Sequence, residues 1–216
     1  MPNNVRNIIK MKGIVNLPLF YTNEGKKCFD FNKLIPMPDS LNVPCGSITD
    51  EAIIYYVTDK CSIPIGCVDK EKLQIVKDTI FMGAYERTFL RTMESMWNKP
   101  ERERNDLYEK GRVYVENYKK YGCATWYDWS IINWGTKWNA YSNEQVGDDM
   151  IIFSTAWDEP SPIVQKLSEK YPNIEIEHLY ADEFEGNKEG YKIYFGGKAV
   201  EKSTENMDIY HKCWGR

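Results

Sequence analysis

Hydrophobic and polar positions alternate over the first segment of the chain. Val5, Asn7, Ile9 and Met11 fall on one side of an extended chain, and the residues between them fall on the other. A repeat of two residues is typical of a β-strand, and we predict a strand over 5–12 that Gly13 ends. The segment 29–38 contains Pro36 and Pro38, which remove two backbone donors, so it is predicted to be an ordered extended loop. Its apolar anchors are Phe29, Phe31, Leu34 and Ile35.

A helical repeat replaces this alternation in the middle of the chain. Helices are predicted from Ser47 to Val57, from Asp69 onward with an apolar stripe that continues past Gly83 to Trp97, and from Pro100 to Tyr121. Pro100 suits the first turn of the last helix, and Gly122 suits the position after it. We interpret residues 47–122 as a helical insertion that covers a sheet.

The C-terminal third returns to strands around one helix. The continuous apolar run 150–157 predicts a buried strand, and the spacing of Ile163, Val164, Leu167 and Tyr171 predicts a helix after it. Alternation then predicts strands over 174–180 and 191–195. The second could lie at a sheet edge, and a free edge could pair into a homodimer. The order strand, helix, strand, strand favours an α+β fold, and no linker divides residues 1–216, so a single domain is predicted.

Composition and charge exclude several classes of protein. The chain has 216 residues, 28 basic and 32 acidic side chains and a net charge of −4, which gives no general attraction to nucleic acid or to an anionic membrane. No apolar run is long enough for a transmembrane helix, and the first residues do not form a signal peptide. The six cysteines form no C-x-x-C pair, so we expect reduced thiols in a cytoplasmic protein, with no metal and no cofactor.

The densest group of candidate functional residues lies between residues 126 and 139. Its four tryptophans could stack on bases or nucleotides, or they could fill the interior as large hydrophobic side chains. Both interpretations stay open on the sequence, with core packing favoured. The candidate ligand-binding residues are Trp126, Asp128, Trp129, Asn133, Trp134, Lys137 and Trp138.

Other titratable residues give weaker signals. His178 falls on the same strand face as Ile174 and Ile176, which is typical of an interior histidine whose hydrogen bonds are satisfied. The acidic loop 182–190 lacks the ligand spacing of a calcium loop and is predicted to be a solvated hairpin tip. No phosphate-binding loop, nucleophile elbow or zinc-protease motif is present, so we name no catalytic residue.

Four sequence segments carry a resemblance to a known family. They are F-D-F-N-K-L-I-P-M-P at 29–38, N-W-G-T-K-W-N at 133–139, F-S-T-A-W-D-E-P at 153–160 and Y-A-D-E at 180–183. In this order they resemble the YubB-type family of phage and plasmid proteins, over the first forty residues and about 123–198. The resemblance implies a ferredoxin-like antiparallel sheet with helices on one face, which names the strand arrangement and not an iron–sulfur cluster. It implies no reaction and no catalytic residues.

Three hypotheses about function follow. The first is a phage, prophage or plasmid accessory protein in the bacterial cytoplasm that binds a host protein or a small nucleotide-like ligand without catalysis, and so inhibits host defence. The second is a nucleic-acid-binding module that uses the sheet face and the tryptophan-rich segment. Net acidity disfavours it, although a local basic patch of Lys119, Lys120 and Lys137 could offset this. The third and least favoured is an enzyme that uses Asp128, Lys137 or His178.

Overall fold

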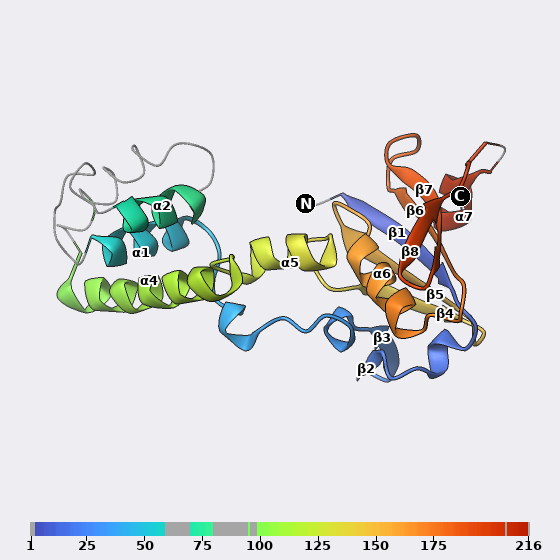
Figure 1. Ribbon diagram of the computed structural model, residues 1–216, viewed down its shortest axis with the longest axis horizontal. Coiled ribbons are helices and arrows are strands. Elements are labelled where there is room, and N and C mark those ends of the chain that lie inside the picture. Colours follow the sequence, from blue (N-terminus) through green and yellow to red (C-terminus); the bar gives the residue numbers. More distant parts are fainter. Residues whose placement is uncertain (1–2, 59–69, 80–94, 96–98, 206, 216) are drawn as a thin grey trace. The chain divides into compact units, whose positions relative to one another are not determined.

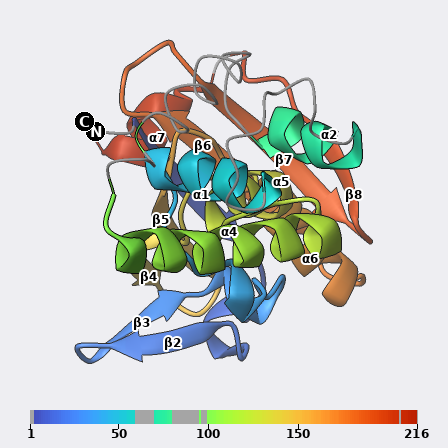
Figure 2. The ribbon, with the colours of Figure 1, turned by 90° about the vertical axis from the view of Figure 1, so that its left-hand side faces the viewer.

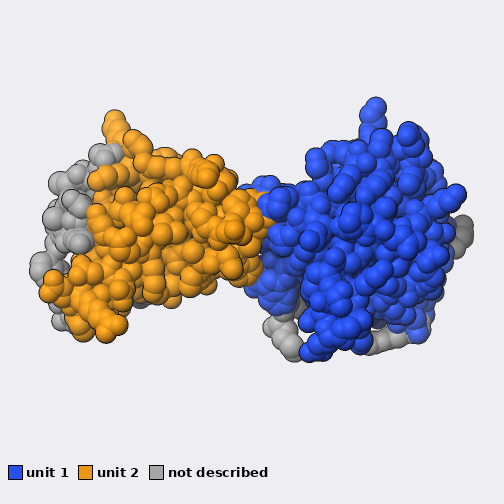
Figure 3. Space-filling model, turned by 90° about the horizontal axis from the view of Figure 1, so that it is seen from below, with its two compact units in different colours: residues 1–36, 130–216 blue, residues 37–129 orange. Residues whose placement is uncertain are grey.

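The chain divides into two compact units. The computed structural model describes all residues except 1–2, 59–69, 80–94, 96–98, 206 and 216. Unit 1 comprises residues 1–36 and 130–216, and unit 2 comprises residues 37–129 (Figure 3). Unit 2 contains the whole of the predicted insertion at 47–122 and extends beyond both of its ends. That residues 1–216 form a single domain stays a prediction.

Unit 1 is built on a six-stranded antiparallel sheet with the order β4-β5-β1-β6-β7-β8 (Figure 1). β5 and β6 both run antiparallel to β1, which lies between them, and α6 connects them. This split β-α-β arrangement belongs to the ferredoxin-like fold. The strands are β1 (Asn4–Lys10), β4 (Tyr141–Val146), β5 (Met150–Ala156), β6 (Ile176–Asp182), β7 (Glu189–Phe195) and β8 (Lys198–Glu201), and the helices packed on them are α6 (Ser161–Lys170) and α7 (Ile209–Trp214).

The two helices lie on opposite faces of this sheet. α7 packs Ile209 and Cys213 against Ile8, Leu179 and Ala181. α6 covers the other face, where Ser161 Oγ lies 3.0 Å from the hydroxyl of Tyr194. The α+β ferredoxin-like class is therefore confirmed, but the prediction of helices on one face is wrong in this detail. The short helix α7 is stabilised by these buried contacts with the sheet. Its six residues are too few to show a helical repeat in the sequence.

A hairpin and its flanking turn extend the core beyond the sheet. β2 (Phe20–Asn23) pairs with β3 (Lys26–Phe29), and short 3₁₀ turns span Ile14–Asn16 and Phe31–Lys33. The rings of Phe29 and Phe31 lie 5.4 and 6.0 Å from the ring of Phe153 in β5. The predicted loop 29–38 therefore anchors itself by its aromatic side chains, as expected, although residues 31–33 turn and do not extend.

The periodic segments of unit 1 were predicted better than the edges of its sheet. The predicted elements are confirmed in β1, β5, α6, β6 and β7. The ends of the strands differ from the predicted ends by at most two residues. β7 pairs with both β6 and β8, so residues 191–195 do not form a sheet edge, the possibility that the sequence left open. The edge on this side of the sheet is β8, a strand of four exposed residues that the hydrophobic pattern does not mark.

Unit 2 is helical, and its helices confirm three predicted segments. α1 (Ser47–Val57), α2 (Lys70–Thr79) and α4 (Glu101–Tyr121) follow the 3₁₀ turn Asp39–Leu41. Gly122 ends α4 in the left-handed conformation at φ 71°, which a glycine adopts without steric strain. The predicted continuation of the stripe from Phe81 to Trp97 lies almost wholly outside the described residues.

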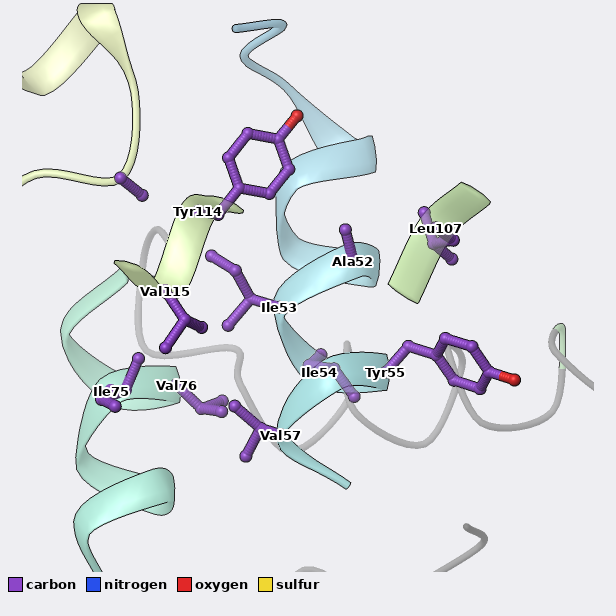
Figure 4. Packing of buried hydrophobic residues seen from close by; sticks show 11 residues of the cluster. Ala52, Ile53, Ile54, Tyr55, Val57, Ile75, Val76, Leu107, Tyr114 and Val115 are labelled. Carbon is purple, nitrogen blue, oxygen red and sulfur yellow. The ribbon is translucent and has the colours of Figure 1, made fainter. Parts of the chain in front are cut away.

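α1 and α4 lie side by side and form the core of unit 2 (Figure 2). Ile53 and Ile54 of α1 pack with Val76 of α2 and Val115 of α4, and all four are buried (Figure 4). Gly111 of α4 faces the backbone carbonyl of Ala52 at a distance that leaves no room for a side chain. The two helices approach this closely because one of them presents a glycine.

Candidate functional site

The tryptophan-rich segment forms a helix and a tight turn. α5 (Trp126–Trp134) begins after Thr125, whose hydroxyl oxygen accepts a hydrogen bond from the Tyr127 amide at 3.3 Å. Gly135 follows with φ 80°, and a Cβ atom at this position would lie 2.7 Å from Cδ of Pro162. Both the backbone conformation and the lack of space therefore require glycine in the N-W-G-T-K-W motif.

Most of this motif packs inside unit 1. Trp134 is buried, and its indole Nε1 donates a hydrogen bond to the carbonyl of Ile35 at 2.9 Å. The centroid of its ring lies 5.8 Å from the centroid of the Phe31 ring. The Thr136 hydroxyl donates to the carbonyl of Ala156 at 2.7 Å. The N-W-G-T part is a packing corner that attaches the end of α5 to β5, and the core interpretation holds for Trp134.

The surface of the same turn is different. Trp138 and Trp157 are 39% and 41% exposed, and the Lys137 ammonium lies over both rings, 5.0 and 4.7 Å from their centroids. A cation above the face of an indole ring is attracted by the ring quadrupole. We call Lys137, Trp138 and Trp157 the tryptophan–lysine clamp.

Trp157 is held in a strained backbone conformation. Its φ is 73°, in a region that a large side chain rarely adopts. Its amide donates to the carbonyl of Asn3 at 2.9 Å, and its carbonyl accepts from the Lys188 ammonium at 3.3 Å. Lys188 also pairs with Asp158 at 2.8 Å. Contacts on both sides of the peptide therefore fix an unfavourable conformation that turns this indole toward Lys137.

The seven predicted site residues are divided between the two units. Lys137 and Trp138 meet in the clamp, Trp134 is buried in the corner, and Asn133 is half-buried at the end of α5. The other three residues belong to unit 2: Trp126 is half-buried, Asp128 is exposed, and Trp129 is buried. Partial desolvation of its carboxyl raises the pKa of Asp128. Within unit 1, α5 ends at Trp134 and Gly135 follows in the left-handed conformation. This turn places Trp134 in the core and Trp138 at the surface, although they are close in sequence.

Trp157 is the clamp residue that the sequence did not single out. It directly follows the apolar strand β5, and the run 150–157 indicated one more core residue. Its exposure depends on the positive φ, which no propensity of tryptophan predicts. The only signal was its place in the segment 153–160 that carries the family resemblance.

His178 of β6 lies in a group of polar side chains that pack against the start of α6. It is fully buried, as predicted, and its Nε2 lies 3.0 Å from Oδ1 of Asn7. Its Nδ1 has no hydrogen-bond partner among the described protein groups and lies 4.0 Å from Oε2 of Glu159. The histidine is thus interior, but the prediction that its hydrogen bonds are satisfied is correct for one nitrogen only.

The remaining titratable groups give no further site within the described residues. Residues 184–189 of the acidic loop are exposed, which agrees with the predicted hairpin tip. In the described part of the chain, no three His, Cys, Asp or Glu side chains are placed to hold a metal ion. Among these residues, too, no helix combines the length and the apolar character needed to cross a membrane. Cys28, Cys45, Cys123 and Cys213 are free thiols, and Cys61 and Cys67 lie outside the described residues.

Comparisons with known proteins support the fold of the C-terminal part. No curated protein matches the chain. A crystal structure of the protein Api92 from Yersinia pseudotuberculosis is similar over 94% of this chain and 99% of that chain, with 11% identity and a TM-score of 0.37. Residues 137–212 match the family model described as the ferredoxin-like domain in Api92-like protein. The predicted ferredoxin-like resemblance is thus shown for this segment, which is similar to the domain of Api92-like proteins.

Proposed function

We propose that this protein binds a small nucleotide-like ligand without catalysis, through the tryptophan–lysine clamp. The observation that supports this most is the position of the Lys137 ammonium over the exposed rings of Trp138 and Trp157. An ammonium group forms an ion pair with a phosphate, and an indole ring can stack on any of the nucleic-acid bases. The clamp therefore offers both kinds of contact that a nucleotide needs.

The strained backbone of Trp157 supports the same interpretation. Strain of this kind costs about 1–3 kcal/mol and persists where the surrounding structure imposes it, often at ligand clamps. The Lys188–Asp158 ion pair and the Asn3 carbonyl impose it here. A tryptophan held at this cost with a half-exposed ring is better explained by contact with a ligand than by core packing.

A host protein is the second candidate partner. Phe184 is 60% exposed in the loop from which Lys188 contacts the Trp157 carbonyl. Large exposed apolar and aromatic side chains are enriched where proteins bind one another. Lys119 and Lys120 lie in unit 2 and Lys137 lies in unit 1, and the nucleic-acid hypothesis stays a prediction.

The biological setting is a further part of the proposal. On the resemblance of the four sequence segments to the YubB-type family, we propose an accessory protein of a phage, prophage or plasmid. Such a protein would act in the bacterial cytoplasm by sequestering a component of host defence. A nucleotide-like signal molecule fits this role, because sequestration needs a binding site and no catalytic groups.

Binding of nucleotides to purified variants tests the proposal. We expect mono- and dinucleotides to raise the melting temperature of the wild type, and we expect at least one to give a heat of binding by calorimetry. Trp157→Ala and Lys137→Ala should weaken this binding, the first by about 5- to 150-fold as for the loss of one stacked base. Phe195→Ala is the matched control, because Phe195 is a 56% exposed aromatic residue of unit 1 outside the clamp.

Three outcomes separate the candidates. Loss of binding in the clamp variants but not in Phe195→Ala supports the proposal. Equal binding in all variants places the ligand elsewhere and contradicts it. If no nucleotide binds, and a bacterial host protein identified by mass spectrometry co-purifies with the wild type but not with Trp157→Ala, the partner is that protein.

A further inference from the structure

A buried polar network lies between α6 and the sheet of unit 1, apart from the clamp. It includes Asn7 of β1, His178 of β6 and Lys192 of β7, with Glu159 and Ser161 at the start of α6. Tyr180 and Tyr194 lie beside the His178 ring, with centroids at 5.4 and 6.3 Å. His178 is completely buried and the Glu159 side chain is 10% exposed, so the polar atoms of these two side chains need partners inside the protein.

The hydrogen bonds of Asn7 determine which nitrogen of His178 carries the proton. Val5 contributes a carbonyl oxygen, which can only accept, at 3.0 Å from the Asn7 amide group. The Asn7 atom on that side is therefore the nitrogen, and its other hydrogen is directed to the Thr155 hydroxyl at 2.9 Å. The amide oxygen faces His178, so Nε2 of His178 is the donor and Nδ1 of the neutral ring is an acceptor.

The hydrogen bonds of Glu159 are just as unequal. Its Oε1 accepts from the Ser161 hydroxyl at 2.7 Å and from the Lys192 ammonium at 2.8 Å. Its Oε2 is buried and has no hydrogen-bond partner among the described protein groups. Oε2 lies 4.0 Å from Nδ1 of His178, so two acceptors face each other in the interior.

Protonation of the histidine does not resolve this arrangement at neutral pH. Burial, and the charge of the nearby Lys192, lower the pKa of His178 to about 3, although the Glu159 carboxylate lies close to Nδ1. The other titratable groups around the ring are Tyr180 and Tyr194, and burial raises the pKa of each hydroxyl. Both tyrosines are uncharged near pH 7, and Lys192 already balances the charge of Glu159.

We propose that Nδ1 of His178 and Oε2 of Glu159 form a binding site for one neutral hydroxyl donor, a single water molecule. An oxygen about 2.8 Å from both acceptors, which are 4.0 Å apart, directs its two hydrogens at an angle of about 90°. This is close to the angle within water, and buried waters typically serve polar groups that lack other partners. The water links β6 to the start of α6 and completes the network from Asn7 to Lys192.

A high-resolution crystal structure together with nitrogen-15 NMR of the histidines tests this inference on the wild type. We expect one isolated density peak within hydrogen-bond distance of both atoms, and an Nε2-protonated neutral His178 at pH 7. An imidazolium at pH 7, or a direct contact of Nδ1 with Oε2 at 3.2 Å or less, would overturn the proposal. Density continuous with a larger molecule would overturn it as well, because the site would then take a ligand hydroxyl.

A variant and a control extend the test. His178→Phe removes both ring nitrogens and should abolish the density peak beside Glu159. Tyr191→Phe removes a hydroxyl that bonds Glu177 at 3.0 Å, a pair on the opposite face of the sheet, and should retain the peak. If the His178 variant does not fold, the wild-type structure and spectra still decide. A peak that persists in a folded His178→Phe protein contradicts a site that needs Nδ1.

Discussion

Gly111→Ala should destabilise unit 2, although helix propensity alone predicts the reverse. Glycine inside a helix is less favourable than alanine by about 0.8–1.0 kcal/mol, so the substitution would stabilise an isolated α4. In the folded unit, however, the added Cβ would overlap the backbone carbonyl of Ala52 and lie 2.7 Å from Cβ of Tyr56. Neither group is the flexible end of a side chain, so the two helices have to move apart.

The magnitude follows from the difference between these two effects. Overpacking of a well-packed contact costs about 1–3 kcal/mol, and more where backbone atoms have to shift. Subtraction of the gain in propensity leaves about 0–2 kcal/mol. Because backbone atoms have to shift at this contact, we expect a net loss near the upper end, about 2 kcal/mol, in the free energy of unfolding. Separation of α1 from α4 would also loosen the cluster around Ile53 and Val115.

Urea denaturation followed by circular dichroism at helical wavelengths measures this loss. The matched control is Lys110→Ala, which changes an exposed neighbour in the same helix and should shift the unfolding free energy by less than about 0.5 kcal/mol. A Gly111→Ala protein that is more stable than the wild type by about the propensity difference would refute the close contact of α1 with α4.

Three other measurements test separate parts of the structure. Trp134→Ala should reduce the unfolding free energy by about 3–5 kcal/mol, because it leaves a cavity at a buried position. Trp138→Ala should reduce it by about 1 kcal/mol or less, because this side chain is partly exposed. Equal losses in urea denaturation would contradict the division of the motif into core and surface. The pKa of His178 is about 3 in the folded protein and about 6.5 in the unfolded chain. The neutral histidine therefore contributes fully to stability above about pH 6.5. This contribution falls by up to about 1.4 kcal/mol per pH unit as the pH drops from about 6.5 toward 3. Urea melts across this range should show a smaller loss in His178→Gln, and an identical loss would mean that the histidine is not buried uncharged. Burial raises the pKa of the Cys213 thiol to about 12, so a thiol reagent at pH 8 should label exposed Cys45 in the native protein and Cys213 only after unfolding; rapid native labelling of Cys213 would contradict the packing of α7.

Sequence patterns predicted those elements whose cause is local. β1, β5 and α6 are marked by periodicity within their own residues, and α4 is also bounded by Pro100 and Gly122. The strands β4 and β8 were not predicted, because β4 is mostly polar and β8 is a short, fully exposed segment. Both form by hydrogen bonding to a neighbouring strand. Their formation depends on the partner rather than on their own composition.

The candidate site was predicted only in part, for the same reason. The sequence indicated Lys137 and Trp138 but grouped them with Trp134, because adjacent tryptophans have the same composition and hydrophobicity. What separates them is the contact of Trp134 with Ile35, 99 residues away in the chain, and the turn at Gly135. Trp157 belongs to the clamp because of its positive φ, a backbone conformation that the sequence does not indicate.

By itself, then, the amino-acid sequence determined an α+β protein with a helical middle, a C-terminal order of strand, helix, strand and strand, and a tryptophan-rich segment. Hydrophobic periodicity, caps and breakers act over a few residues, so they can be recognised without the partner surface. Tertiary structure decided which tryptophans are exposed, why position 111 has to be glycine, and that His178 and Glu159 face each other. These properties depend on distances between residues far apart in the chain, and a distance of this kind exists only when the long-range contacts have formed.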